Sequence, residues 1–219
     1  MDDQQPNQSE QNQNNIPNDS PIQGQVKISQ PKKDSKRSII TTIALFLLAP
    51  IIAILLTMFV FQSYEVEGPS MESTLQHQDR LIVNKMPVTW ANITSNNYLP
   101  ERGDIIVFEQ RNSATAENQL IKRVIALPGE RVLIRDGDIT VYNDHNPDGF
   151  NPDTDQEHGD KVGNTTGNVD ITVGDDEIFV LGDNRTNSLD SRAFGAVKQD
   201  DIVGTLVMRL WPFNNIETY

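Results

Sequence analysis

Ser70 and Lys122 are the two residues of this chain whose types and surroundings suggest catalytic chemistry. Ser70 lies in the segment GPSM at 68–71, soon after a long apolar stretch, and Lys122 lies in QLIKRVIA at 119–126. A serine hydroxyl is a weak nucleophile that needs a neighbouring base, and a lysine can act as that base where burial disfavours its charged form. The pair therefore predicts a serine hydrolase with an amine as its base, if the fold brings the two side chains together.

The strand pattern around Lys122 leaves two possibilities for its side chain. Neighbouring residues in a strand point to opposite faces, so Lys122 and Arg123 are expected to diverge. One of them can then face a dry site while the other stays in water. A lysine on an exposed strand face is the alternative when this stretch is taken by itself.

A third segment, GDNRTNSLDSRAFG at 182–195, follows an apolar run and is rich in polar and charged side chains. A plain turn does not need so many hydrogen-bonding groups. Ser188 or Ser191 could bond the catalytic amine and orient it. Asp190 and Arg192 could pair and hold the loop.

The chain contains few residues that could support thiol, metal or histidine catalysis. There is no cysteine, which excludes disulfides, thiol nucleophiles and thiolate metal sites. The three histidines, His77, His145 and His158, have no metal-ligand spacing, and no His–Asp pair suggests itself beside the serine. We therefore expect neither a metal nor a cofactor.

Residues 62–219, which must position these groups, follow a strand pattern. Short β-branched runs are bounded by Gly, Pro, Asn or Asp, and no long helical pattern interrupts them. We expect a mainly β domain built as coiled antiparallel sheets or a partly open barrel. The predicted strands lie at residues 80–84, 104–108, 120–125, 131–135, 138–142, 170–173, 177–181 and 201–207.

The polar segment 143–168 departs from the strand pattern and is expected to be a long exposed insertion. Its acidic residues Asp153, Asp155 and Glu157 could suggest a calcium site. Their spacing lacks the glycine at the sixth position and the glutamate at the twelfth that an EF-hand loop requires. A solvated loop is the interpretation we adopt.

Residues 38–61 carry no charge and are expected to form a membrane-spanning helix. A helix of that length rises roughly 36 Å, enough to cross a hydrocarbon core of about 30 Å. A buried core helix would keep a polar face, and a cleaved signal peptide would have a shorter apolar region and a small-residue cleavage site. Residues 1–37 are polar and expected to be a disordered tail.

Basic residues directly before this span indicate its orientation. Positive flanks stay in the cytoplasm, so the tail is expected inside and residues 62–219 outside. The formal net charge of −13 argues against a nucleic-acid partner, because phosphate binding needs a basic face. The basic residues are Lys32, Lys33, Lys36 and Arg37.

Together these motifs resemble the bacterial type I signal peptidase (leader peptidase) family. The shared features are Gly-x-Ser-Met after a membrane span, Lys-Arg with Leu-Pro-Gly downstream, and Gly-Asp-Asn-Arg-x-x-Ser-x-Asp-Ser-Arg, in that order. The resemblance covers roughly residues 64–210 apart from the insertion at 143–168.

The resemblance implies a plasma-membrane enzyme with one span, a cytoplasmic N-terminus and an extracytoplasmic catalytic domain. It would remove signal peptides from exported pre-proteins by cutting after small residues at Ala-x-Ala sites, with signal peptides and the lipid bilayer as partners. Ser70 is implied as the nucleophile, Lys122 as the general base and Ser188 as the group that orients the lysine. Supporting residues are Asp183, Asp190 and Arg192, and substrate-binding residues are Val66, Gly68, Met71, Leu75 and Ile121.

Two positions depart from the family pattern. Some members have a serine two residues before the nucleophile that completes the oxyanion hole, and this chain has Gly68 there. The family's Met-x-Pro-Thr-Leu reads Met-Glu-Ser-Thr-Leu at 71–75, so a proline is missing from that turn. Neither change removes the nucleophile or the base.

Two other readings compete with signal peptide removal. A self-cleaving Ser–Lys peptidase like the SOS repressor family shares the dyad but lacks a membrane anchor and carries a DNA-binding domain. A catalytically inactive membrane-anchored β domain that acts as a binding module is the alternative from outside the enzymes, and it would be expected to lose Ser70 or Lys122 first.

Overall fold

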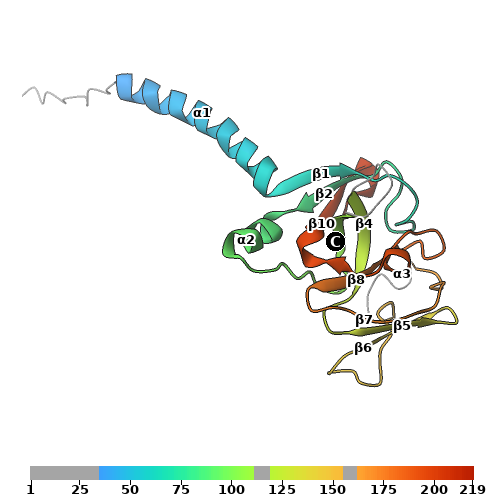
Figure 1. The fold of residues 1–219 in the computed structure, drawn as a ribbon. Coiled ribbons are helices and arrows are strands. Elements are labelled where there is room, and N and C mark those ends of the chain that lie inside the picture. Colours follow the sequence, from blue (N-terminus) through green and yellow to red (C-terminus); the bar gives the residue numbers. More distant parts are fainter. Residues whose placement is uncertain (1–34, 111–118, 155–161) are drawn as a thin grey trace, which may run out of the picture. The chain divides into compact units, whose positions relative to one another are not determined.

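The computed structural model describes residues 35–110, 119–154 and 162–219 of the chain (Figure 1). Its helices are α1 (Ser35–Phe59), α2 (Met86–Thr94) and α3 (Ser191–Phe194), with the 3₁₀ turns η2 (Gln199–Asp201) and η3 (Phe213–Asn215). Its strands are β1 (Phe61–Glu65), β2 (Arg80–Asn84), β3 (Ile105–Glu109), β4 (Gln119–Ala126), β5 (Arg131–Arg135), β6 (Asp138–Tyr142), β7 (Val169–Thr172), β8 (Glu177–Leu181), β9 (Val197–Lys198), β10 (Ile202–Trp211) and β11 (Glu217–Thr218).

Helix α1 contains the apolar stretch identified in the sequence. Within it, Ile39–Thr57 has a mean hydropathy of 2.8, and its side chains are exposed. Among the described residues it is the one helix long and apolar enough, by length and composition, to cross a membrane. Most of the tail expected at residues 1–37 lies outside the described part of the chain.

The main sheet is antiparallel and curls on itself without closing. Its strand order is β1-β2-β10-β3-β4-β8-β9, and β11 pairs with β10. The long strand β10 pairs with β2 and with β3, and shifts of register interrupt both pairings. Such irregularities bend a strand and increase its twist. Within the described ranges β1 has one strand neighbour, β2, and β8 pairs with β4 only at Arg123, Val124 and Ala126.

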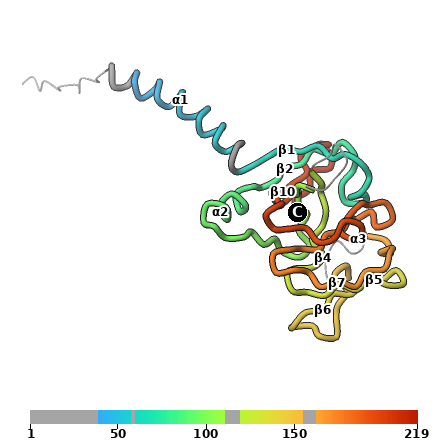
Figure 2. Tube along the Cα trace, viewed as in Figure 1, coloured from blue at the N-terminus to red at the C-terminus, as the bar shows by residue number. Residues whose placement is uncertain are grey.

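A small second sheet, in the order β6-β5-β7, packs beside β4 and β8 (Figure 2). The inward side chains of both sheets form one buried cluster that includes Ile125 and Phe179 from the main sheet and Val132 and Val141 from the small one. A further cluster lies beside β1 and contains Val66, Met71, Leu75, Leu81, Ile105 and Leu206. These clusters hold the segments that carry the candidate site.

The structure confirms the predicted mainly β, antiparallel class. Strands 80–84, 131–135, 138–142 and 177–181 have the predicted limits. Helix α2 was not predicted, because its nine residues are too few for a clear helical period. It begins beside Pro87, which suits the first turn of a helix because proline has no N–H to leave unbonded.

Candidate active site

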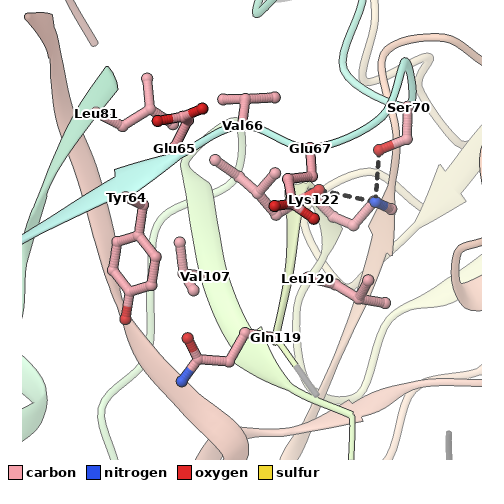
Figure 3. Close-up of a pocket in the computed structure, with 11 residues that line it drawn as sticks. Tyr64, Glu65, Val66, Glu67, Ser70, Leu81, Val107, Gln119, Leu120 and Lys122 are labelled. Carbon is pink, nitrogen blue, oxygen red and sulfur yellow. Dashed lines mark hydrogen bonds between the residues drawn. The ribbon is translucent and has the colours of Figure 1, made fainter. Parts of the chain in front are cut away.

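The structure brings Ser70 and Lys122 into contact, although they are 52 positions apart. The Lys122 Nζ donates a hydrogen bond of 2.9 Å to Ser70 Oγ and another of 2.8 Å to the Ile121 carbonyl oxygen (Figure 3). Lys122 is only 2% exposed. An amine and a hydroxyl at this distance can exchange a proton directly, once the amine is neutral.

Strand pairing determines where the two cations of β4 point. Ile106 lies opposite Lys122, and Ile105 lies opposite Arg123, so the cations leave the strand on opposite faces, as predicted. The expectation that one of them stays in water is wrong, because Arg123 is only 6% exposed. It can be buried because it has a buried carboxylate partner.

That partner is Asp183, which joins all three sequence motifs. Arg123 donates from Nε to Asp183 Oδ1 over 2.9 Å and from Nη2 to Oδ2 over 2.6 Å. Thr74, four residues beyond the nucleophile, donates from its hydroxyl to the same Oδ2 over 2.5 Å. Paired hydrogen bonds of this kind fix the guanidinium and the carboxylate in one plane. Asp183 therefore links the nucleophile turn, the lysine strand and the loop that follows β8.

Ser70 itself lies in a tight turn after β1. The backbone N–H of Glu72 donates to the carbonyl oxygen of Pro69 over 3.1 Å. Gly68, just before the turn, has a φ of +79°, in the left-handed region that favours glycine. A Cβ at this position would meet no atom within 4 Å, so backbone conformation and not crowding makes glycine suitable here.

Gly182 directly follows β8 and lies against the nucleophile turn. A Cβ at Gly182 would lie 2.2 Å from Ser188 Oγ and 2.4 Å from the Ser70 carbonyl oxygen, closer than any real contact. The Gly182 N–H donates to Asp190 Oδ2 over 3.1 Å. Only glycine permits this close approach of the loop to the nucleophile.

The remaining predicted polar residues have distinct places in the 182–195 segment. Asp190 and Arg192 form the expected ion pair, with Nε to Oδ1 at 2.8 Å and Nη2 to Oδ2 at 2.7 Å. Ser191 accepts a hydrogen bond of 3.0 Å from the Val180 N–H, so its hydroxyl supports the backbone. The Ser188 hydroxyl is buried and has no hydrogen-bond partner among the described residues, so its role toward the lysine stays a prediction.

Asn184 contacts the nucleophile turn and was not singled out in the sequence. Its N–H donates to the Ser70 carbonyl oxygen over 3.1 Å, and its side-chain amide donates to the Pro69 carbonyl oxygen, also over 3.1 Å. Its place in the polar segment was a signal, but neither bond could be read from spacing. These two bonds hold the loop and the nucleophile turn together.

A cavity of about 140 Å³ extends from the Ser70–Lys122 contact between β1 and β4 (Figure 3). These two strands are not neighbours in the sheet order, so the cavity lies where the curled sheet remains open. Among the described residues, β1 and the first half of β4 have no strand partner on this side, and an extended peptide could pair with them. The lining residues are Tyr64, Glu65, Val66, Glu67, Ser70, Leu81, Val107, Gln119, Leu120, Ile121 and Lys122.

The five predicted substrate-binding residues do not all line this cavity. Val66 and Ile121 line it. Met71 and Leu75 are 1% and 0% exposed and belong to the apolar cluster beside β1. Gly68 does not line the cavity either.

Tyr64 lines the cavity and was not predicted from the sequence. Burial and then the nearby Glu109 carboxylate raise the pKa of its phenol. It therefore remains neutral at physiological pH. Tyr64 lies two positions before Val66, and residues two apart on a strand point to the same face. This spacing was the signal that could have identified Tyr64.

Several known proteins are similar to this chain over most of its length. The family model described as signal peptidase, peptidase S26, matches residues 39–211. Signal peptidase I P of Bacillus subtilis subsp. natto is 35% identical over 184 residues, covering 83% of this chain and 93% of that protein. Signal peptidase I of Bacillus caldolyticus is 38% identical over 165 residues, covering 72% and 84% of the two chains.

A crystal structure of a signal peptidase I from Enterococcus faecalis V583 is also similar, at 34% identity. The match covers 50% of this chain and 97% of the Enterococcus faecalis chain, with a TM-score of 0.39. The extent of the family match and the identity to curated relatives over most of both chains are sufficient to assign the family. This chain belongs to the type I signal peptidase family, peptidase S26.

Proposed function

We propose that this protein is a membrane-anchored serine endopeptidase that removes N-terminal signal peptides from exported pre-proteins. The observation that carries the proposal is the 2.9 Å contact between Ser70 Oγ and the Nζ of the buried Lys122. The family assignment supplies the substrate class. The open cavity beside the contact offers room for an extended chain.

In this proposal Ser70 attacks the carbonyl carbon of the scissile peptide bond while the neutral Lys122 amine takes its proton. The Ser70 N–H donates to the developing oxyanion. Collapse of the tetrahedral intermediate breaks the C–N bond, and the lysine ammonium returns its proton to the leaving amine. The signal peptide is then bound as an ester to Ser70 Oγ. Lys122 next activates a water molecule that hydrolyses this ester and regenerates the serine.

Apolar residues on both sides of the cavity, Val66 just after β1 and Ile121 in β4, support a preference for small side chains at the cleavage site. Val66 and Ile121 contribute apolar surface to the cavity that Ser70 also lines. A site of this kind favours alanine-like residues before the cut and agrees with the Ala-x-Ala specificity that we propose.

Helix α1 would anchor the enzyme in the membrane that its substrates also occupy. Sharing one surface increases the effective concentration of enzyme and substrate. The proposed orientation, with the catalytic domain outside, rests on the basic cluster at residues 32–37, of which Lys36 and Arg37 belong to the described helix α1 and Lys32 and Lys33 lie outside the described residues.

The test uses the full chain purified in detergent, incubated with a pre-protein that carries an Ala-x-Ala site, with products weighed by mass spectrometry. We expect one cut after the second alanine, and a loss of at least about 10³-fold in Ser70→Ala and in Lys122→Ala. Ser73→Ala and Lys198→Ala, which change exposed residues of the same types, are the controls. A folded wild-type protein that binds the pre-protein but leaves it intact would favour the binding-module alternative.

A further inference from the structure

A buried ion pair connects the insertion at 143–168 to the loop beside the nucleophile. Arg185 donates from Nη1 to Asp153 Oδ2 and from Nη2 to Asp153 Oδ1, both over 2.6 Å. The Arg185 side chain is fully buried, and Asp153 is 8% exposed. The expectation of a solvated Asp153 is therefore wrong, because an arginine of a distant segment neutralises it. Asp155 and Glu157, the other members of that acidic cluster, lie outside the described residues.

The described hydrogen bonds of the Arg185 side chain all go to the insertion. Its Nη1 also donates to the hydroxyl of Thr165, at the other end of the insertion. Its Nε is buried without a hydrogen-bond partner among the described residues. A buried guanidinium that loses its carboxylate keeps an uncompensated charge, so Arg185 is held in place by Asp153 and Thr165.

The insertion itself is fixed to the small sheet. Phe150 pairs with Val141 of β6 in a β-bridge, with hydrogen bonds of 2.8 and 2.9 Å. The Thr165 N–H donates to the carbonyl oxygen of Gly137, in the β5–β6 turn, over 3.0 Å. The contact of Asp153 with Arg185 therefore rests on a sheet and not on a free loop.

At the other end, Arg185 is adjacent to the residue that contacts the nucleophile turn. Asn184 donates through its N–H to the Ser70 carbonyl oxygen and through its side chain to Pro69. Arg192 adds a parallel connection, since its Nη1 donates to the carbonyl oxygen of Thr166 over 2.9 Å. A displacement of Arg185 would therefore move the group that supports Ser70.

We propose that Asp153 is a positioning residue for catalysis, which acts through Arg185 to hold residues 182–188 against the nucleophile turn. The inference rests on the proposed peptidase function. It assigns a role to the insertion, whose acidic cluster lacks the spacing of an EF-hand loop. Asp153 is not among the described residues that line the substrate cavity, and it is not a partner in the Ser70–Lys122 hydrogen bond, so its removal should alter turnover more than substrate binding.

The test compares Asp153→Asn with Asp170→Asn in the full chain. Asp170 is the matched control, because it forms the same bidentate pair with an arginine, Arg131, at 2.7 Å for both bonds, but on the exposed face of the small sheet. We expect kcat per folded molecule to fall about tenfold to hundredfold in Asp153→Asn with KM nearly unchanged. Asp170→Asn should leave both unchanged.

Hydrogen exchange provides a second readout that does not depend on activity. The Asn184 amide, bonded to the Ser70 carbonyl oxygen, should exchange at least about tenfold faster in Asp153→Asn and at the wild-type rate in Asp170→Asn. Thr165→Val, which removes only the neutral bond to Arg185 and leaves the ion pair, should shift kcat and exchange in the same direction by less. It is the substitute if Asp153→Asn does not fold.

Unchanged turnover per folded molecule together with unchanged Asn184 exchange in Asp153→Asn would overturn the proposal. A lower melting temperature alone, with kcat preserved, would also overturn it, because it would show a purely structural pair. Failure of the wild-type enzyme to cut any pre-protein would instead reject the proposed peptidase function. The exchange comparison would still decide whether Asp153 holds the loop.

Discussion

Arg123 and Asp183 form a buried bidentate ion pair that joins the strand carrying the candidate base to the loop beside the candidate nucleophile. The side chains are 7% and 0% exposed, and the bonds are 2.9 and 2.6 Å long. Thr74 adds a third bond to the same carboxylate. One acidic group thus fixes the relative positions of three segments that are distant in sequence.

Replacing this acid should destabilise the whole domain. Asp183→Asn leaves the Arg123 guanidinium buried without a neutralising charge, which costs about 3–5 kcal/mol of unfolding free energy when a buried pair is broken. Urea unfolding of the full chain in detergent would measure the loss. Asp175→Asn, at an exposed position, should change the unfolding free energy by less than about 0.5 kcal/mol. Equal stability of the two variants would contradict the role assigned to Asp183.

Gly182→Ala should reduce cleavage without any change of charge. The new methyl group would overlap Ser188 Oγ and the Ser70 carbonyl oxygen, so the loop must move away from the nucleophile. A displacement of about 1 Å at a reacting group can reduce the rate about 10²-fold. Single-turnover cleavage of a pre-protein would measure this. Gly163→Ala, where a Cβ meets no atom within 4 Å, should cleave at the wild-type rate.

A lysine base makes the reaction sensitive to pH in one direction. Only the neutral amine can accept the serine proton, so the single-turnover rate should rise with pH, about tenfold per unit while the ammonium predominates. Lys122→Arg should be inactive at every pH, because a guanidinium remains protonated. A rate that is flat from about pH 5 to pH 9 in the wild type, with chemistry limiting, would exclude Lys122 as the base.

Glu130 should make stability depend on acid pH. Burial by itself would raise the pKa of Glu130, but hydrogen bonds from Arg102, the Leu127 N–H and Asn143 outweigh burial and lower this pKa. A lowered pKa means that the ionised carboxylate stabilises the fold above the unfolded-state pKa of about 4.3. This contribution disappears as pH falls through the lower, folded-state pKa.

Glu130→Gln should therefore lose about 1–3 kcal/mol of unfolding free energy at pH 7. The difference from wild type should become smaller below about pH 4, where the wild-type residue itself becomes protonated. Urea unfolding at neutral pH and at about pH 3 would measure it. The exposed Glu101→Gln serves as the control, and a wild-type advantage that grows toward acid pH would contradict a lowered pKa for Glu130.

Local pattern was sufficient to predict eight of the eleven described strands and the residue types of the site, but β1, β9 and β11 were not predicted. Runs such as 131–135 and 138–142 alternate between buried positions and exposed or half-exposed ones, and a period of two identifies them without any knowledge of the fold. Lys122 was a candidate because it lies in an apolar strand run, and the accompanying motifs with their family resemblance favoured a base over an exposed lysine. The motif resemblance also identified Asp183, Asp190 and Arg192 as candidate supporting residues.

The remaining contacts depend on pairing between distant segments, which no local pattern contains. Arg123 was expected in water because its partner is 60 positions away. The same holds for Asp153 and Arg185, separated by 32 positions. Tyr64 and Asn184 belong to segments that the sequence identified, but their directions follow from how the sheet curls.

The short connection between α1 and β1 has a consequence for which bonds can be cut. Helix α1 ends at Phe59 and β1 begins at Phe61, so Ser70 follows the helix by 11 residues (70 − 59). A fully extended chain of that length reaches at most about 40 Å, at roughly 3.3–3.6 Å per residue. With α1 as the proposed anchor, the serine must stay within this distance of the end of the helix. A peptide bond held farther than that from the end of the helix is out of range, whatever residues precede it, so height above the bilayer becomes a second criterion of substrate choice.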